Sequence, residues 1–119
     1  MFDAIGASRA EAIMVLTSSF LYARRQQLVD LAAQHRLAAS YEHRSFVNAG
    51  GLMSYGPDLA AMYHRAARYI DKILKGAGPG DLPIEQPTKF DLAINLKTAK
   101  ALGLTLPPSI LLQATEVIE

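Results

Sequence analysis

The most constraining feature of the sequence is an amphipathic segment at residues 57–75, which lies between two glycines. Its apolar side chains recur at spacings of three and four residues, so they form one stripe of an α-helix. The stripe consists of Leu59, Met62, Tyr63, Ala66, Ile70, Ile73 and Leu74. Pro57 suits the first helical position, Asp58 suits the positive helix start, and Gly76 supplies a C-terminal stop. Such a stripe needs a sheet or a partner to cover it.

Short apolar segments on either side of this helix predict strands. Residues 12–16 form a continuous apolar run, which indicates a strand covered on both faces, as in a parallel sheet. Residues 37–41 and 52–55 predict two further strands, each of them short. Residues 90–96 alternate apolar and polar side chains, which predicts a strand with one exposed face at the edge of the sheet.

Helical patterns separate these strands. They predict the end of a helix at residues 2–7, a helix at 20–35, a helical turn at 45–49, a short helix at 97–102 that stops at Gly103, and a last helix at 109–117 opened by Pro107 and Pro108. The alternation of strands with helices predicts a three-layer α/β fold with a mostly parallel sheet.

Composition limits the classes of function. A length of 119 residues is that of one domain. The formal charge is only +1, from 12 basic and 11 acidic residues, which argues against nucleic acid as a partner. Without cysteine there are no disulfides and no thiolate metal sites. No apolar run approaches the ~20 residues of a membrane-spanning helix.

The sequence offers little to catalysis or to cofactors. His35, His43 and His64 have no metal-ligand spacing, so we expect neither a metal site nor a cofactor. No nucleophile is accompanied by a base and an orienting acid, so we expect no enzyme. The first residues lack the charged-then-apolar order of a secretory signal. As written the chain is expected to be cytoplasmic, or to be a piece whose start lies elsewhere.

The first candidate binding turn is Thr17-Ser18-Ser19, which follows the strand at 12–16 and precedes a helix. In parallel α/β sheets ligands bind outside the carboxyl ends of the strands, and the free N–H groups of a first helical turn attract carboxylate or phosphate. Phe20 offers a surface on which an apolar ligand can stack. The simpler alternative is an ordinary N-cap serine followed by a core phenylalanine.

Two more turns are expected at the same end of the sheet. Glu42 follows the second strand and suits a ligand amino group, while Arg44 suits a carboxylate in bidentate geometry. The alternative for this turn is a solvated polar loop. At the third turn Tyr55 and Asp58 flank Gly56-Pro57, and Asp58 either binds an ammonium group or satisfies helix N–H groups.

Three segments carry a resemblance to a known family. They read GGLMSYGPDL, YIDKILKGAGPGDLPIEQPTKFDLAINLKTAKALGLTLPPSIL and ATEVIE. The sequence resembles the C-terminal portion of ABC transporter substrate-binding proteins of the type I periplasmic-binding fold. It is most similar to the subgroup whose better-known members take up aromatic amino acids. The resemblance covers essentially the whole chain.

The resemblance implies a fragment of a two-lobed, non-catalytic solute-binding protein. Residues 1–50 and 88–119 would belong to the second lobe, and residues 51–76 would cross to the first. A small organic solute such as an amino acid would lie between the lobes, and the Thr17 turn would face it. The 119 residues alone are therefore expected to bind no solute tightly.

Partners and location follow from the same resemblance. The full-length protein would be periplasmic or membrane-anchored and would serve an ABC permease and its ATPase. In the short chain the helix at 57–75 would lack its covering sheet, so its stripe would seek another surface, such as that of a second copy in a homodimer. A cytosolic ligand-sensing or regulatory domain with the same lobe fold is the alternative function.

Overall fold

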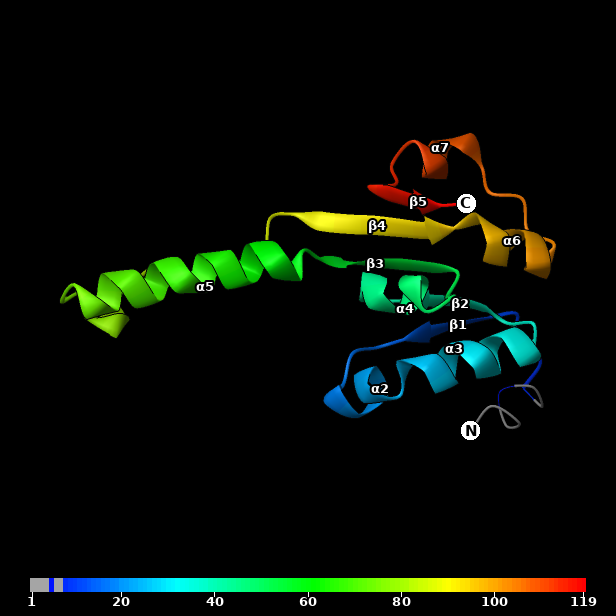
Figure 1. The fold of residues 1–119 in the computed structure, drawn as a ribbon, viewed down its shortest axis with the longest axis horizontal. Coiled ribbons are helices and arrows are strands. Elements are labelled where there is room, and N and C mark those ends of the chain that lie inside the picture. Colours follow the sequence, from blue (N-terminus) through cyan, green and yellow to red (C-terminus); the bar gives the residue numbers. More distant parts are fainter. Residues whose placement is uncertain (1–4, 6–7) are drawn as a thin grey trace. The chain divides into compact units, whose positions relative to one another are not determined.

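The computed structural model describes Ile5 and residues 8–119. In chain order its elements are β1 (Ala12–Val15), α2 (Ser19–Ala23), α3 (Arg25–Gln34), β2 (Ala38–Tyr41), α4 (Arg44–Asn48), β3 (Met53–Pro57), α5 (Leu59–Leu74), a 3₁₀ turn η1 (Pro79–Asp81), β4 (Phe90–Asn95), α6 (Leu96–Leu102), α7 (Pro108–Leu111) and β5 (Glu116–Ile118) (Figure 1). The helix end predicted at residues 2–7 lies outside the described residues, apart from Ile5.

The chain divides into two compact units. Unit 1 comprises residues 1–56 and 91–119, and unit 2 comprises residues 57–90. Unit 2 is therefore an excursion from unit 1, since the chain leaves at the end of β3 and returns at the start of β4.

The sheet has five strands in the order β1-β2-β3-β4-β5. β1 pairs with β2, β2 with β3, and β4 with β5, all in parallel. β4 is antiparallel to β3. Asn95 N–H donates to Leu52 O at 2.9 Å and Asp58 N–H donates to Lys89 O at 3.1 Å, so residue numbers increase along one strand as they decrease along the other. The arrows of β3 and β4 in Figure 1 point in opposite directions accordingly. The predicted α/β class with a mostly parallel sheet is confirmed.

Two strand predictions are corrected by this order. The segment at 90–96 was predicted at an edge, but β4 lies between β3 and β5 and buries Ala93, Ile94 and Asn95. The run at 12–16 was predicted to be covered on both faces, but β1 is the edge strand and leaves Met14 75% exposed. An apolar run shows that the side chains of a strand can be buried, but the position of the strand in the sheet decides how many of them are buried.

Three helix predictions are also corrected. The single helix predicted at 20–35 is two helices, because Arg24 adopts a non-helical conformation between α2 and α3. The last helix, predicted to reach residue 117, ends at Leu111, and the closing residues form β5, whose pairing with β4 outweighs local helix preference. Pro57 ends β3 instead of opening α5.

The core of unit 1 lies between α3, β2 and α4. It contains Leu28, Val29, Ala32, Leu37, Ala39, Tyr41 and Phe46. The rings of Tyr41 and Phe46 are stacked with centroids 4.7 Å apart. Burial raises the pKa of the Tyr41 phenol to about 12. Each large aliphatic or aromatic side chain buried here stabilises unit 1 by about 1.5–3 kcal/mol.

Unit 2 consists of α5 and the returning segment at 77–90. α5 has the predicted amphipathic pattern, and Asp58 caps it by accepting a hydrogen bond from Ala61 N–H at 3.0 Å. No residue of α5 is buried. The apolar stripe is thus present as a helix face but is not covered as a core.

Candidate functional site

The candidate site of unit 1 lies at one edge of the sheet. β1, β2 and β3 are parallel, so the turns that follow them meet at their carboxyl edge, where Thr17 and Glu42 lie. β4 is antiparallel to β3 and β5 is parallel to β4, so the first residues of these two strands lie at the same edge. This brings Asp91 and Glu116 to the edge, although the sequence did not mark them.

The turn after β1 is exposed and already serves as a helix start. Ser18 is the N-cap of α2 and its hydroxyl oxygen accepts a hydrogen bond from Leu21 N–H at 3.1 Å. Thr17 and Ser19 are exposed beside it. Phe20 is 63% exposed, so it is not a core residue, and the Arg24 guanidinium lies 4.0 Å from its ring centroid. The turn therefore presents hydroxyls and an aromatic face to solvent.

Aromatic contacts join this turn to the next one. Tyr22 of α2 meets His43 edge-on, with ring centroids 5.7 Å apart, and meets Phe46 at 6.2 Å. Tyr22 was not selected from the sequence, because helical periodicity says nothing about a neighbouring turn. These contacts place the turns after β1 and β2 side by side.

A glycine brings β3 against the second turn. A Cβ at Gly56 would lie 2.0 Å from the backbone oxygen of Glu42 and 3.1 Å from its Cγ, so only glycine fits. Glu42 is half-buried there. The preceding residue, Tyr55, is 59% exposed. Because successive residues of a strand face opposite sides, its side chain lies on the face of β3 away from the contact between Gly56 and Glu42.

Arg44 does not stand free at this edge, because its guanidinium forms an ion pair with Glu116. The pair borders a hollow of about 260 Å³ that is also lined by Asp91, Ala93 and Thr115. Thr115 is fixed to β4, since its N–H donates to Leu92 O at 2.8 Å and its hydroxyl oxygen accepts from Leu92 N–H at 3.2 Å.

Asp58 belongs to unit 2 and both of its carboxylate oxygens are engaged. Oδ1 accepts from Ala61 N–H at 3.0 Å and Oδ2 accepts from Lys89 Nζ at 2.7 Å. The hydrogen bond from Lys89, with that from Ala61 N–H, lowers the pKa of the Asp58 carboxyl below its usual value. Of the two roles considered for Asp58, the structure shows the helix-capping one.

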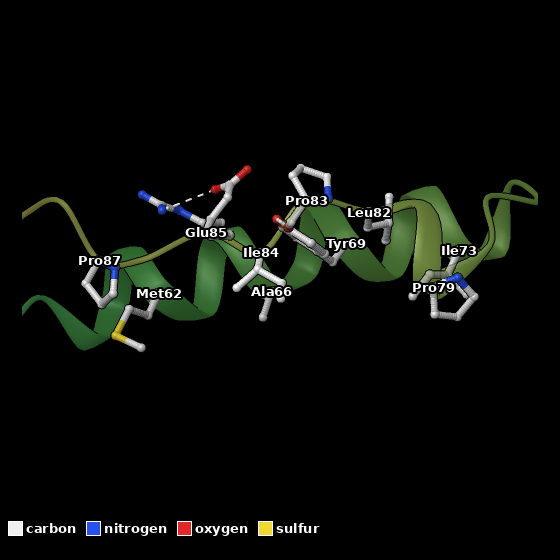
Figure 2. Close-up of a pocket in the computed structure, with 11 residues that line it drawn as sticks. Met62, Ala66, Tyr69, Ile73, Pro79, Leu82, Pro83, Ile84, Glu85 and Pro87 are labelled. Carbon is white, nitrogen blue, oxygen red and sulfur yellow. Dashed lines mark hydrogen bonds and ion pairs between the residues drawn. The ribbon is translucent and has the colours of Figure 1, made fainter.

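Unit 2 also contains an apolar groove of about 420 Å³ between α5 and residues 79–87 (Figure 2). Figure 2 shows Pro79, Leu82, Pro83 and Pro87 along the returning segment, opposite Met62, Ala66, Tyr69 and Ile73 of α5. Side chains of α5 hold the segment: Arg65 pairs with Glu85 at 3.2 Å and donates to Gln86 O at 3.0 Å, and the Tyr69 hydroxyl donates to Pro83 O. Desolvation and the nearby Glu85 raise the pKa of Tyr69.

Among Ile5 and residues 8–119, no three acidic or histidine side chains are grouped as a metal ion would require. Within the same residues, no helix combines the length and apolar character needed to cross a membrane.

The mostly parallel sheet, with polar turns gathered at its carboxyl edge, defines an α/β lobe of the ligand-binding type. Residues 5–118 match the profile of the family described as ABC transporter substrate binding protein, and the chain belongs to this family. The resemblance seen in the sequence is thereby confirmed.

Solved structures agree with this assignment. A conserved domain protein from Vibrio cholerae is 28% identical with a TM-score of 0.89, and the match covers 98% of this chain and 39% of that one. The ABC domain from Streptococcus pneumonia, solved in complex with L-Trp, is 28% identical with a TM-score of 0.85, covering 96% and 40%.

A third structure shares the fold at greater distance. It is a ligand-free, open substrate binding protein with adhesive properties from Clostridium difficile, 18% identical, with a TM-score of 0.67 over 98% of this chain and 40% of that one. The chain thus spans about two fifths of the length of the solved structures it matches. Comparison with curated proteins gives no match.

Proposed function

We propose that this chain forms part of the solute-binding component of an ABC importer and binds a small organic solute, such as an amino acid, without catalysing a reaction. The observation that carries the proposal is the family match over residues 5–118, together with a 28% identical relative that was solved with L-Trp. In this function the protein would work outside the cytoplasmic membrane and deliver its solute to a permease driven by an ATPase.

The proposed organisation has two lobes, of which this chain supplies a part. Residues 1–50 and 88–119 would belong to the second lobe, and residues 51–76 would cross to the first. The division into units at 57 and 90 supports this organisation, as does the span of two fifths of the relatives' length. The missing part of the first lobe would then cover the apolar stripe of α5.

The proposed solute-facing residues lie in the turns at the carboxyl edge of β1, β2 and β3. They are Thr17, Ser19, Phe20, Glu42, Arg44 and Tyr55. Ser18 and Asp58 are not included, because their side chains cap the helices α2 and α5. Hydroxyls, an aromatic face and charges of both signs suit a small zwitterion with an apolar side chain.

The test is a binding panel on the complete product of the gene. Thermal-shift screening with the twenty common amino acids and related small acids and amines selects solutes, and calorimetry then measures their affinity. We expect at least one to bind with a Kd in the micromolar range or tighter and to be recovered unchanged after prolonged incubation. Chemical conversion of the solute, or specific binding of DNA by the same protein, would refute the proposal.

A second measurement uses residues 1–119 alone. With the opposing wall absent, we expect binding of the selected solute to weaken to the millimolar range or to vanish, because a half-cleft leaves the solute in water. Sub-micromolar binding by this chain alone would overturn the two-lobe proposal. Sedimentation of the same sample shows whether this chain forms a dimer, as a second copy on the α5 stripe would require.

A further inference from the structure

Tyr22 connects the two turns that carry most of the proposed solute-facing residues. The turn after β1 leads into α2, and the turn after β2 leads into α4. The ring of Tyr22 meets the ring of His43 with a centroid distance of 5.7 Å and an interplanar angle of 86°. It meets the ring of Phe46 at 6.2 Å and 78°. Both are edge-to-face contacts, which are attractive because the positive edge of one ring lies against the negative face of the other.

The position of α2 depends on its contacts with the rest of unit 1. The helix has five residues, and none of them is buried. A helix this short is not stable by itself in water, so packing has to hold it in place. Leu21, which is partly buried against the core, and Tyr22 supply that packing. The hydrogen bonds from the N–H groups of these two residues go to Ser18, so they are local and do not reach the second turn.

Phe46 gives Tyr22 a fixed point of attachment. Phe46 is 4% exposed, and its ring is stacked on that of Tyr41 with centroids 4.7 Å apart. Arg25, the first residue of α3, lies over the Tyr22 ring with its guanidinium carbon 5.3 Å from the centroid. Tyr22 itself is 39% exposed, yet three side chains contact its ring. These contacts restrict the ring although it lies near the surface.

The imidazole ring of His43 is available for this contact because α4 does not use it. His43 is the N-cap residue of α4, but its side chain makes no capping hydrogen bond. In the sequence it lies between Glu42 and Arg44, which are two of the proposed solute-facing residues. A contact that fixes the His43 ring therefore also limits the positions that its two neighbours can take.

We propose that Tyr22 is a positioning residue for solute binding, which holds the turn after β1 at a fixed distance from the turn after β2 through its contacts with His43 and Phe46. This inference rests on the proposed function. Tyr22 acts through the two turns and not by touching the solute. Because the ring makes these contacts, the hydroxyl group is not required, and phenylalanine should be able to replace tyrosine at this position.

The first test is nuclear magnetic resonance on residues 1–119 without any solute. We expect nuclear Overhauser effects between the ring protons of Tyr22 and those of His43. In His43→Ala the amide resonance of Thr17 should shift, although Thr17 lies on the other turn, because α2 loses one of its contacts. Leu112→Ala, at an 87% exposed position, is the control and should leave that resonance unchanged. Absence of the Overhauser effects, or an unchanged Thr17 resonance in His43→Ala, would overturn the inference.

The second test measures affinity on the complete gene product. The ligands are the twenty common amino acids, beginning with L-tryptophan, and the related small acids and amines of the binding panel. For the ligand that wild type binds most tightly, Tyr22→Leu should weaken binding by about 3-fold to 10-fold, because both ring contacts are lost. Tyr22→Phe keeps the ring and should bind within about 2-fold of wild type.

A double-mutant cycle separates positioning from a general loss of stability. If Tyr22 acts through His43, Tyr22→Leu should reduce affinity by a smaller factor in the His43→Ala protein than in wild type. A substitution that only destabilises the fold would reduce affinity by the same factor in both proteins. The thermal unfolding midpoint of each variant is measured as well, and affinities are compared well below the lowest midpoint.

Each outcome decides a different point. If a solute binds and Tyr22→Leu leaves its affinity unchanged, or if Tyr22→Phe weakens it as much as Tyr22→Leu does, the positioning role is wrong and the proposed function stands. If the effects of Tyr22→Leu and His43→Ala are additive, Tyr22 does not act through His43 and the inference is again wrong. If no ligand of the panel binds to wild type, the proposed function fails, and the positioning role fails with it.

Discussion

Unit 1 and unit 2 treat their apolar side chains in opposite ways. In unit 1 the residues Val47 and Ile94 are at most 1% exposed, and seven core residues pack between α3, β2 and α4. In unit 2 the helix α5 has a continuous apolar stripe, yet Ile70 is 58% exposed and no residue of the helix is buried. The difference shows that an amphipathic pattern specifies a helix without specifying the surface that covers it.

The largest expected effect comes from shortening one isoleucine in each unit of the 119-residue chain. Ile94→Ala should lower the free energy of unfolding by about 2–5 kcal/mol, because it opens a cavity in a closed core. Ile70→Ala should change it by less than about 0.5 kcal/mol, because most of that side chain is already in water. Urea unfolding measures both values.

The difference between the two units would be contradicted if Ile70→Ala lowered the free energy of unfolding as much as Ile94→Ala does. The α5 stripe would then be buried in solution, and a dependence of the unfolding midpoint on protein concentration would identify a second copy as its cover.

An intermediate effect is expected from adding a methyl group at one glycine of each unit. Gly56→Ala should destabilise unit 1 by at least about 1–3 kcal/mol, because the new Cβ would lie 2.0 Å from the Glu42 backbone oxygen. Gly80→Ala should stabilise by about 0.4–1 kcal/mol, because nothing lies within 4 Å and the unfolded chain loses freedom. Thermal unfolding separates the two signs, and a stable Gly56→Ala protein would show that β3 does not approach residue 42 this closely.

The smallest expected effect is local and depends on pH. The folded-state pKa of Asp58 is lowered, so its contribution is complete above the unfolded value of about 4 and is lost as pH falls through the folded value. The amide resonance of Ala61, which donates to Asp58, should therefore shift on acidification. Asp58→Asn keeps a cap acceptor but should abolish this titration and the ion pair with Lys89. If the pH-dependent shift of the Ala61 amide resonance were unchanged in Asp58→Asn, the titration of a group other than Asp58 would be its cause.

Much of the fold was predictable because it depends on local periodicity. The stripe at 57–75 predicted α5 to within two residues at its start, and Gly103 predicted the end of α6, where it adopts a φ of 74° as its C-cap. Local pattern failed at the closing residues, where β5 forms by pairing with β4. It failed again at β4, whose alternation suggested an edge although both neighbours are strands.

The candidate site was predictable only in part, for a related reason. The turns after β1 and β2 follow apolar runs, so their position at the carboxyl edge can be inferred from chain order alone. Asp91 and Glu116 lie at the starts of β4 and β5, and residue 116 was predicted to lie in the last helix, so no pattern in the sequence marked either residue. Only the reversal of β4 against β3 brings them to Arg44.

The sequence by itself determined the α/β class, the amphipathic helix, the polar turns after β1 and β2, and the family, because each depends on neighbours along the chain. Tertiary structure alone decided the direction of β4, the exposure of the α5 stripe and the pairing of Arg44 with Glu116. The physical reason is that the excursion of residues 57–90 returns the chain beside the strand it left, with Asp58 N–H bonded to Lys89 O. Because the chain returns in this way, β4 runs antiparallel to β3, and the apolar–polar alternation within β4 carries no information about that direction.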